Sequence, residues 1–224
     1  MAKAVLISIR PEWVDKILSG EKTLEVRKTC PKLETPFKCY IYCTQASVQH
    51  QTICGCRVLN SDELYRHPEQ GIKHGSSIEL MLCENYTKDN FLNGKVIGEF
   101  VCNKIDVIQR MGIPANFDYC YLSLNEWGND DIETEIRDIM GSCIPKERLN
   151  SYAGKTPVLY AWHISDLKIY ETPKELTEFH TWKKCKSCSK SGYESTACIY
   201  DENCMVPVAI TKAPQSWCYV EELT

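Results

Sequence analysis

The sequence predicts an α+β protein dominated by strands: a small mixed β-barrel with short helices at its ends, followed by a cysteine-rich C-terminal extension. Short β-rich runs recur along the chain, and helical spacing is confined to brief stretches. The sequence contains no glycine-rich dinucleotide motif, no phosphate-binding loop motif and no nucleophile elbow. The 224 residues are 43% hydrophobic and carry a net charge of −4. This composition is that of a globular protein, and it excludes a broadly cationic nucleic-acid coat but not one local basic site.

The chain opens with a strand and a helix. Residues 4–10 are rich in β-branched and aliphatic side chains, and Pro11 follows where the first turn of a helix tolerates proline. Apolar residues then recur at helical spacing as far as Leu18, and Gly20 is a suitable C-terminal stop.

A second strand is expected over residues 22–28, because polar and apolar side chains alternate there. Leu24 and Val26 should share one face of this strand. Glu25 and Arg27 should share the other face.

The middle of the chain predicts further elements around an insertion. Residues 37–43 and 94–108 have strand character, and Gly98 suggests a bulge or a close approach of two backbones. Residues 144–152 form a short helix candidate. The polar stretch 45–93, between the strand candidates at 37–43 and 94–108, is interpreted as an insertion or a long excursion.

The last strong strand candidate covers residues 157–170. Its apolar phase switches between Ile164 and Leu167, which a β-bulge or a barrel corner would explain. The composition then becomes more polar. We therefore expect a barrel over residues 1–170 and a cysteine-rich extension over 171–224, docked on the barrel as one compact unit.

A set of polar positions spans the first strand, helix and second strand. It comprises Ser8, Ile9, Arg10 and Pro11, followed by Gly20, Lys22, Glu25 and Arg27. This pattern resembles the start of ASCH domains, which belong to the PUA-like superfamily. Residues 212–222 resemble the C-terminal signature of phage- and bacterium-borne ASCH proteins. The resemblance implies a barrel with a central cleft that binds RNA or a small nucleotide or nucleoside.

The chemistry of these residues suits such a ligand. Two arginines and a lysine around Glu25 could hold a phosphate, while Glu25 accepts from a base or orients an arginine. Residues 1–32 contain seven basic and four acidic side chains in a chain that is acidic overall. The predicted ligand-binding residues are Ser8, Arg10, Lys22, Glu25 and Arg27, with Lys22 at the mouth of the cleft. The alternative is a solvent-exposed ladder of ion pairs.

The resemblance also raises a hydrolase on the same cleft. Some ASCH proteins deacetylate N4-acetylcytidine with a lysine, a threonine and a distant glutamate; Lys22 matches that lysine, but Glu25 stands at the threonine position. Thr23 shares a strand face with Glu25 and could substitute. A ribonuclease would use Lys22, Glu25 and Arg27 to stabilise a phosphorane. Binding module and enzyme, with Lys22 and Glu25 catalytic, both stay open.

Trp162 and His163 alternate on the late strand. One of them should enter the core, and the other could face the cleft and contact the ligand. Trp162 in the core and His163 partly exposed is the favoured assignment, although a tryptophan stacked on a base would contribute about 1–3 kcal/mol.

The chain has 14 cysteines but no recognisable export signal and no apolar run long enough for a membrane span. We expect a cytoplasmic protein with reduced thiols, most of them packed as small apolar side chains, and no membrane partner. Four cysteines cluster with the spacing of a chelating site: Cys185, Cys188, Cys198 and Cys204. They predict a structural Zn²⁺, with His180 and Cys218 as spare ligands. Free thiols or an adventitious disulfide are the alternatives. The sequence identifies no protein partner.

Overall fold

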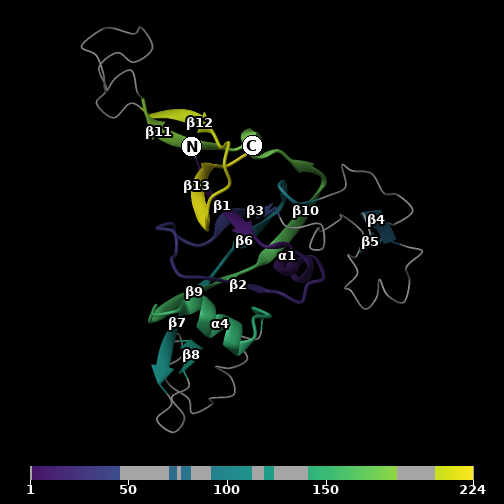
Figure 1. Cartoon of the computed structure of the whole chain (residues 1–224). Helices are drawn as coiled ribbons and strands as arrows, with labels where there is room; N and C mark the ends of the chain where they lie inside the picture. The colour runs from purple at the N-terminus through teal and green to yellow at the C-terminus, as the bar shows by residue number, and fades with distance from the viewer. Residues whose placement is uncertain are drawn as a thin grey trace.

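The computed structural model describes residues 2–45, 92–112, 141–185 and 205–223, together with the strands at 71–74, 77–81 and 119–123. Strands dominate this part of the chain, and two α-helices accompany them (Figure 1). The mixed α+β class expected from the sequence is confirmed.

The larger sheet has five strands in the order β10-β6-β3-β1-β13. These are β10 (Ser165–Lys174), β6 (Val96–Cys102), β3 (Phe37–Cys43), β1 (Lys3–Ile9) and β13 (Trp217–Glu221). β1 and β3 run parallel, and the other neighbours are antiparallel. The C-terminal strand β13 therefore pairs with the N-terminal strand β1, as Figure 1 shows.

The second sheet is antiparallel, with the order β2-β9-β7-β8. Its strands are β2 (Leu24–Arg27), β9 (Val158–His163), β7 (Ile105–Gly112) and β8 (Tyr119–Ser123). Among the described residues, no ladder joins the two sheets into a ring. The closed barrel expected from the sequence is thus replaced by two open sheets that share a core.

The remaining strands of the described ranges form two antiparallel pairs. β4 (Gly71–His74) pairs with β5 (Ser77–Met81), and these are the described residues of the expected insertion at 45–93, together with its two ends. β11 (His180–Lys184) pairs with β12 (Met205–Ala209).

The chain passes from one sheet to the other at Ile164. β9 ends at His163 in the four-stranded sheet, and β10 begins at Ser165 in the five-stranded sheet with a register shift before Lys168. This corner explains the switch in apolar phase. It also places the expected domain boundary at residue 170 inside β10, so the extension continues directly from a strand of the sheet.

Two helices confirm the local sequence signals. α1 (Pro11–Leu18) has proline in its first turn, and Gly20 follows it with a φ of +76°. α4 (Lys146–Ala153) begins after Pro145. A 3₁₀ turn, η4 (Leu176–Glu178), follows β10. None of the described helices has the length and apolarity to cross a membrane.

Both faces of β1 are buried. Val5, Ile7 and Ile9 lie in the core between the sheets and α1, while Ala4 and Leu6 belong to a second cluster on the outer face. That outer cluster includes residues of the C-terminal extension: Leu176, Phe179, Ile210 and Val220. The extension therefore covers a sheet face that would otherwise be exposed. A third cluster packs α4 against the four-stranded sheet.

Three cysteines behave as small core side chains. Cys39, Cys43 and Cys102 are fully buried between the sheets. Burial raises the pKa of the Cys43 and Cys102 thiols to about 12 each and that of Cys39 well above its usual value. These thiols stay protonated at neutral pH, which suits packing rather than chemistry.

Gly98 lies in β6 where two neighbouring backbones come close. A Cβ at this position would lie 2.4 Å from the carbonyl oxygen of Lys168. The register with β3 also shifts between Ile41 and Tyr42, opposite this glycine. Both the bulge and the close approach expected from the sequence are confirmed.

Candidate functional site

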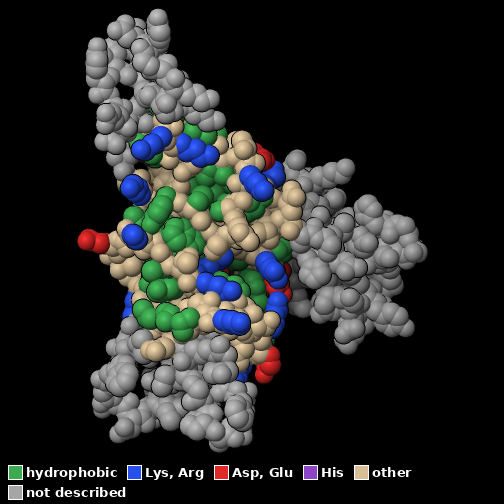
Figure 2. Space-filling view, turned by 60° about the vertical axis from the view of Figure 1, so that its left-hand side comes forward, with side chains coloured by type: hydrophobic (Ala, Val, Ile, Leu, Met, Phe, Trp, Pro, Cys, Tyr) green, Lys and Arg blue, Asp and Glu red, His purple; other side chains and the backbone are tan. Residues whose placement is uncertain are grey.

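A cavity of about 630 Å³ opens where β1, α1, β2, α4 and the segment before β13 meet. We call it the Ser8–Arg27 cavity. Its lining residues are Ser8, Ile9, Arg10, Trp13, Lys22, Glu25, Val26, Arg27, Thr44, Ile144, Arg148, Ser151, Tyr152, Pro214 and Gln215. Four of these side chains are cationic, one is acidic and two are aromatic. Lys and Arg predominate over acidic side chains on the face shown in Figure 2.

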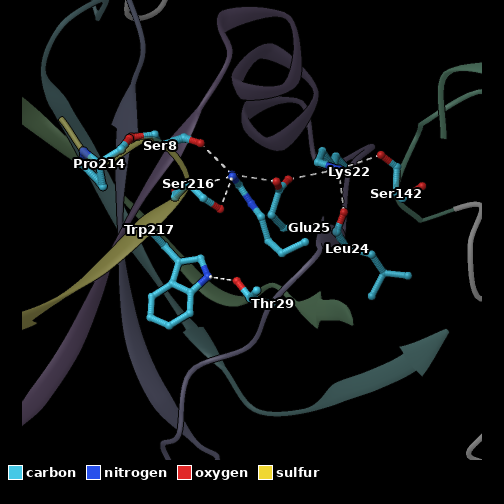
Figure 3. Close-up of polar contacts among 10 residues, drawn as sticks. Ser8, Lys22, Leu24, Glu25, Thr29, Ser142, Pro214, Ser216 and Trp217 are labelled. Carbon is cyan, nitrogen blue, oxygen red and sulfur yellow. Dashed lines mark hydrogen bonds and ion pairs between the residues drawn. The ribbon is translucent and has the colours of Figure 1, made fainter. Parts of the chain in front are cut away.

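Glu25 lies in the wall of the cavity, where its carboxylate pairs with Lys22 on one side and with Arg27 on the other; Figure 3 labels Glu25 and Lys22. Its Oε1 is 2.9 Å from Nη2 of Arg27, and its Oε2 is 3.3 Å from Nζ of Lys22. The three side chains are at most a tenth exposed. The alternative of a solvent-exposed ladder of ion pairs is therefore wrong, because these charges are buried.

The sequence predicts Lys22 at the mouth of the cleft, but the structure places it elsewhere. Its side chain is fully buried, and Nζ donates hydrogen bonds of 2.7 Å to the carbonyl oxygens of Leu24 and Ser142. Nζ also lies 5.4 Å from the centroid of the Trp13 ring. Because the ammonium is held by these partners, Lys22 anchors the cavity wall rather than facing an entering ligand.

Arg27 joins the two sheets and the C-terminal segment. Its Nη2 donates to the carbonyl oxygen of Ser8 at 2.6 Å, and its Nη1 lies 3.3 Å from Oγ of Ser216. Ser8 in turn donates from Oγ to the carbonyl oxygen of Pro214 at 2.6 Å. Pro214 and Gln215 therefore form part of the cavity wall, a role that the local sequence pattern did not assign to them.

The rim of the cavity carries a second contact that sequence analysis missed. Arg148 of α4 forms two hydrogen bonds with the carboxylate of Glu12, at 2.8 and 3.1 Å. Its guanidinium also lies 4.9 Å from the centroid of the Trp13 ring. Arg10, at the end of β1, is exposed at the same cavity. The exposed cations, Arg10 and Arg148, thus lie at the rim. The buried cations, Lys22 and Arg27, lie in the wall and are paired with Glu25.

Tyr152 contributes a partly exposed aromatic surface to the cavity. Nζ of Lys28 lies 5.1 Å from its ring centroid. Burial of the hydroxyl raises the pKa of Tyr152 above its usual value, so this group stays a hydrogen-bond donor at neutral pH.

Thr23, the substitute nucleophile considered above, is exposed and does not line the cavity.

Trp162 belongs to the core and not to the cavity. It is fully buried, with its ring centroid 5.9 Å from that of Phe37 and 5.8 Å from that of Trp217. This burial removes Trp162 from the candidate ligand contacts and supports the favoured assignment of the two residues.

His163 is half-buried and lies outside the lining of the cavity. Its Nε2 is 2.5 Å from Oδ2 of Asp106, whose other oxygen is 3.0 Å from Nζ of Lys104. Burial by itself would raise the pKa of Asp106, but the contacts with His163 and Lys104 outweigh it, and the pKa is lowered. His163 is thus engaged in a separate polar cluster.

The predicted zinc ligands fall mostly outside the described residues. Cys188, Cys198 and Cys204 lie there, whereas Cys185 directly follows β11 and is half-buried. The ladder of β11 and β12 pairs Lys184 with Met205. Within the described ranges, no cluster of three or more histidine, cysteine or acidic side chains has the geometry of a metal site.

Comparison with solved structures returns ASCH domain crystal structures from Zymomonas mobilis. One is 14% identical with a TM-score of 0.47, covering 98% of this chain and 88% of that chain. A tyrosine-to-phenylalanine mutant is 15% identical with a TM-score of 0.47, covering 99% and 92%. A serine-to-alanine mutant is 14% identical with a TM-score of 0.46, covering 98% and 89%. No family model and no curated protein matches the chain.

Proposed function

We propose that this chain is an ASCH-type binding module that holds a nucleotide, free or within RNA, in the Ser8–Arg27 cavity. One observation carries the proposal: four cationic side chains and one acidic side chain line a single cavity in a chain whose net charge is −4. Two aromatic side chains line it as well. Cations that neutralise phosphate beside aromatic rings that contact a base are the usual means of binding single-stranded nucleic acid.

The size of the cavity supports a small ligand or one nucleotide of a longer strand. Its volume of about 630 Å³ lies inside the range of about 300–1,000 Å³ that is typical of small-molecule sites. Because the protein as a whole is acidic, the rest of its surface should repel a polyanion. Affinity should therefore depend on a few contacts at this cavity, with a shallow dependence on salt.

A hydrolase on the same cavity is the second candidate, and the contacts of Lys22 are unfavourable to it. A lysine that acts as a base or a nucleophile needs an available lone pair. Lys22 instead donates to two carbonyl oxygens and pairs with Glu25. Incubation with N4-acetylcytidine and with RNA would separate the candidates. Turnover that is lost in Lys22→Met but not in Lys16→Met, with circular dichroism showing that both variants are folded, would establish the enzyme.

Arg10→Ala should weaken binding of a nucleoside monophosphate about 10- to 100-fold, because a hydrogen bond to a charged group contributes about 1.5–3 kcal/mol. Arg10 is exposed at the rim, so its loss should leave the fold intact. Isothermal titration with AMP, CMP, GMP and UMP measures the effect. The matching nucleosides, which lack the phosphate, should bind both proteins equally.

Lys168→Ala serves as the control, because Lys168 is exposed on β10 and does not line the cavity. It should bind every nucleotide like the unmodified protein. Equal losses in the two variants would mean non-specific charge attraction and would contradict a defined phosphate contact at Arg10.

We also propose that Cys185, Cys188, Cys198 and Cys204 hold one structural Zn²⁺. The pairing of Lys184 with Met205 supports this, because these residues are the chain neighbours of Cys185 and Cys204. Metal analysis of the purified protein should give close to one zinc per chain. Chelation should then speed proteolysis within residues 185–204 while the rest of the chain stays resistant. Purified protein without zinc whose 185–204 segment already resists protease would contradict the site.

A further inference from the structure

Two buried polar atoms in the wall of the Ser8–Arg27 cavity lack a hydrogen-bond partner among the described residues: Oε2 of Glu25 and Nε of Arg27. The Glu25 side chain is 8% exposed and the Arg27 side chain 10%. Buried polar groups are almost always satisfied, and charged ones are especially costly to leave unpaired. An unsatisfied acceptor and an unsatisfied donor on two contacting side chains of one cavity wall therefore indicate a complementary ligand.

The charge of Glu25 is compensated although Oε2 accepts no hydrogen bond. Nζ of Lys22 lies 3.3 Å from Oε2 as an ion pair, while its hydrogen bonds go to the carbonyl oxygens of Leu24 and Ser142. Arg27 holds the other oxygen of the carboxylate, Oε1. Each oxygen of the Glu25 carboxylate thus has a cation nearby, and the lone pairs of Oε2 are left for a hydrogen-bond donor.

The cations of the wall are poorly suited to phosphate. Arg27 already donates to the carbonyl oxygen of Ser8 and contacts Glu25 and Ser216. A phosphate beside them would also stand next to the Glu25 carboxylate, and the two anions would repel each other. The exposed guanidinium of Arg10 at the rim has no such neighbour in the lining. The anionic end of a ligand should therefore face the rim and its hydrogen-bond donors the wall.

We infer that the cavity binds a nucleotide with its base against the wall and its phosphate at the rim, and that it selects bases with an exocyclic amino group. Oε2 of Glu25 accepts a hydrogen bond from the amino N–H, and Nε of Arg27 donates a hydrogen bond to the adjacent ring nitrogen. Both atoms are covered, so the carboxylate turns about its terminal torsion to meet the ligand, a torsion with a broad energy minimum. Lys22 positions the carboxylate. The inference rests on the proposed function and specifies its ligand.

The bases differ in how well they meet this pair of atoms. Adenine, cytosine and guanine each carry an amino group next to a ring nitrogen acceptor. Uracil offers a single imino N–H flanked by two carbonyl oxygens, which a carboxylate repels. Uridine nucleotides should therefore bind more weakly than at least one amino-bearing nucleotide.

Titration with AMP, CMP, GMP and UMP tests the selection. The tightest of the amino-bearing nucleotides should bind at least 10-fold more tightly than UMP. Its N,N-dimethyl form, which keeps the ring nitrogen but has lost the amino N–H, should bind about 10-fold or more weakly than the parent. Glu25→Gln should weaken binding of the parent nucleotide by a similar factor and should hardly change the affinity for UMP. Glu21→Gln, which changes an exposed acid outside the cavity, should behave like the unmodified protein.

The outcomes separate this inference from the proposed function. If Arg10→Ala weakens nucleotide binding but UMP binds as tightly as the others, the base selection is wrong and the nucleotide site stands. If no nucleotide binds, both are wrong. Should Glu25→Gln fail to fold, the dimethylated nucleotide decides with the unmodified protein: undiminished binding of that probe overturns the role of the amino group.

Discussion

Lys22→Met is expected to lower the free energy of unfolding by about 3–5 kcal/mol, the usual cost of removing one partner from a buried ion pair. The substitution keeps the length of the side chain but removes the charge. It leaves the carbonyl oxygens of Leu24 and Ser142 without their donor and Oε2 of Glu25 without its cation. Urea unfolding followed by circular dichroism measures the change.

Two further variants define the cause of that loss. Lys16→Met removes an ammonium that pairs with Glu21 at 3.0 Å on the exposed surface, where the solvent screens the pair, so stability should hardly change. Lys22→Met combined with Glu25→Gln should recover part of the loss, because it removes the uncompensated carboxylate charge. If Lys22→Met proves as mild as Lys16→Met, the buried triad of Lys22, Glu25 and Arg27 is not a stabilising element of the fold.

Phe179→Ala should destabilise the whole protein by about 3–5 kcal/mol, the range for deleting a fully buried phenylalanine side chain. Phe179 follows η4 in the C-terminal extension, and its ring centroid lies 4.9 Å from that of Tyr40 in β3. The cluster around it covers the outer face of the five-stranded sheet. We expect one cooperative unfolding transition, in which fluorescence and circular dichroism coincide.

Matched variants test whether the extension is part of the same folding unit. Phe179→Leu keeps most of the apolar volume and should cost clearly less than alanine. Met205→Ala changes a side chain that is 43% exposed on β12 and should have little effect. Two separate transitions, with residues 171–224 unfolding before the rest, would show that the extension is an independent domain.

Much of the local structure could be predicted from the sequence because local spacing encodes it. The residue pattern predicts the strand of residues 37–43 correctly, and Pro11 together with the helical spacing that ends at Leu18 predicts α1. The assignment of Glu25 and Arg27 to one strand face holds, because side chains alternate along any strand. The corner after His163 was visible as a change of apolar phase. A closed barrel was not a safe inference, since closure depends on pairings between distant strands.

The sequence by itself determined which polar residues of the N-terminal motif belong together, and tertiary structure decided which of them are buried and which are exposed at the Ser8–Arg27 cavity. The motif identified Arg10, Lys22, Glu25 and Arg27 together, with no means of ranking them. Their roles diverge because of partners far along the chain: Lys22 is held by a carbonyl 120 residues away, and Ser8 is bound to Pro214 across 206 residues. A charge held by such contacts becomes part of the wall, whereas Arg10, exposed at the rim, stays available to a ligand. Spacing along a sequence records side-chain type and face, but burial and hydrogen-bond partners arise only when distant segments pack together.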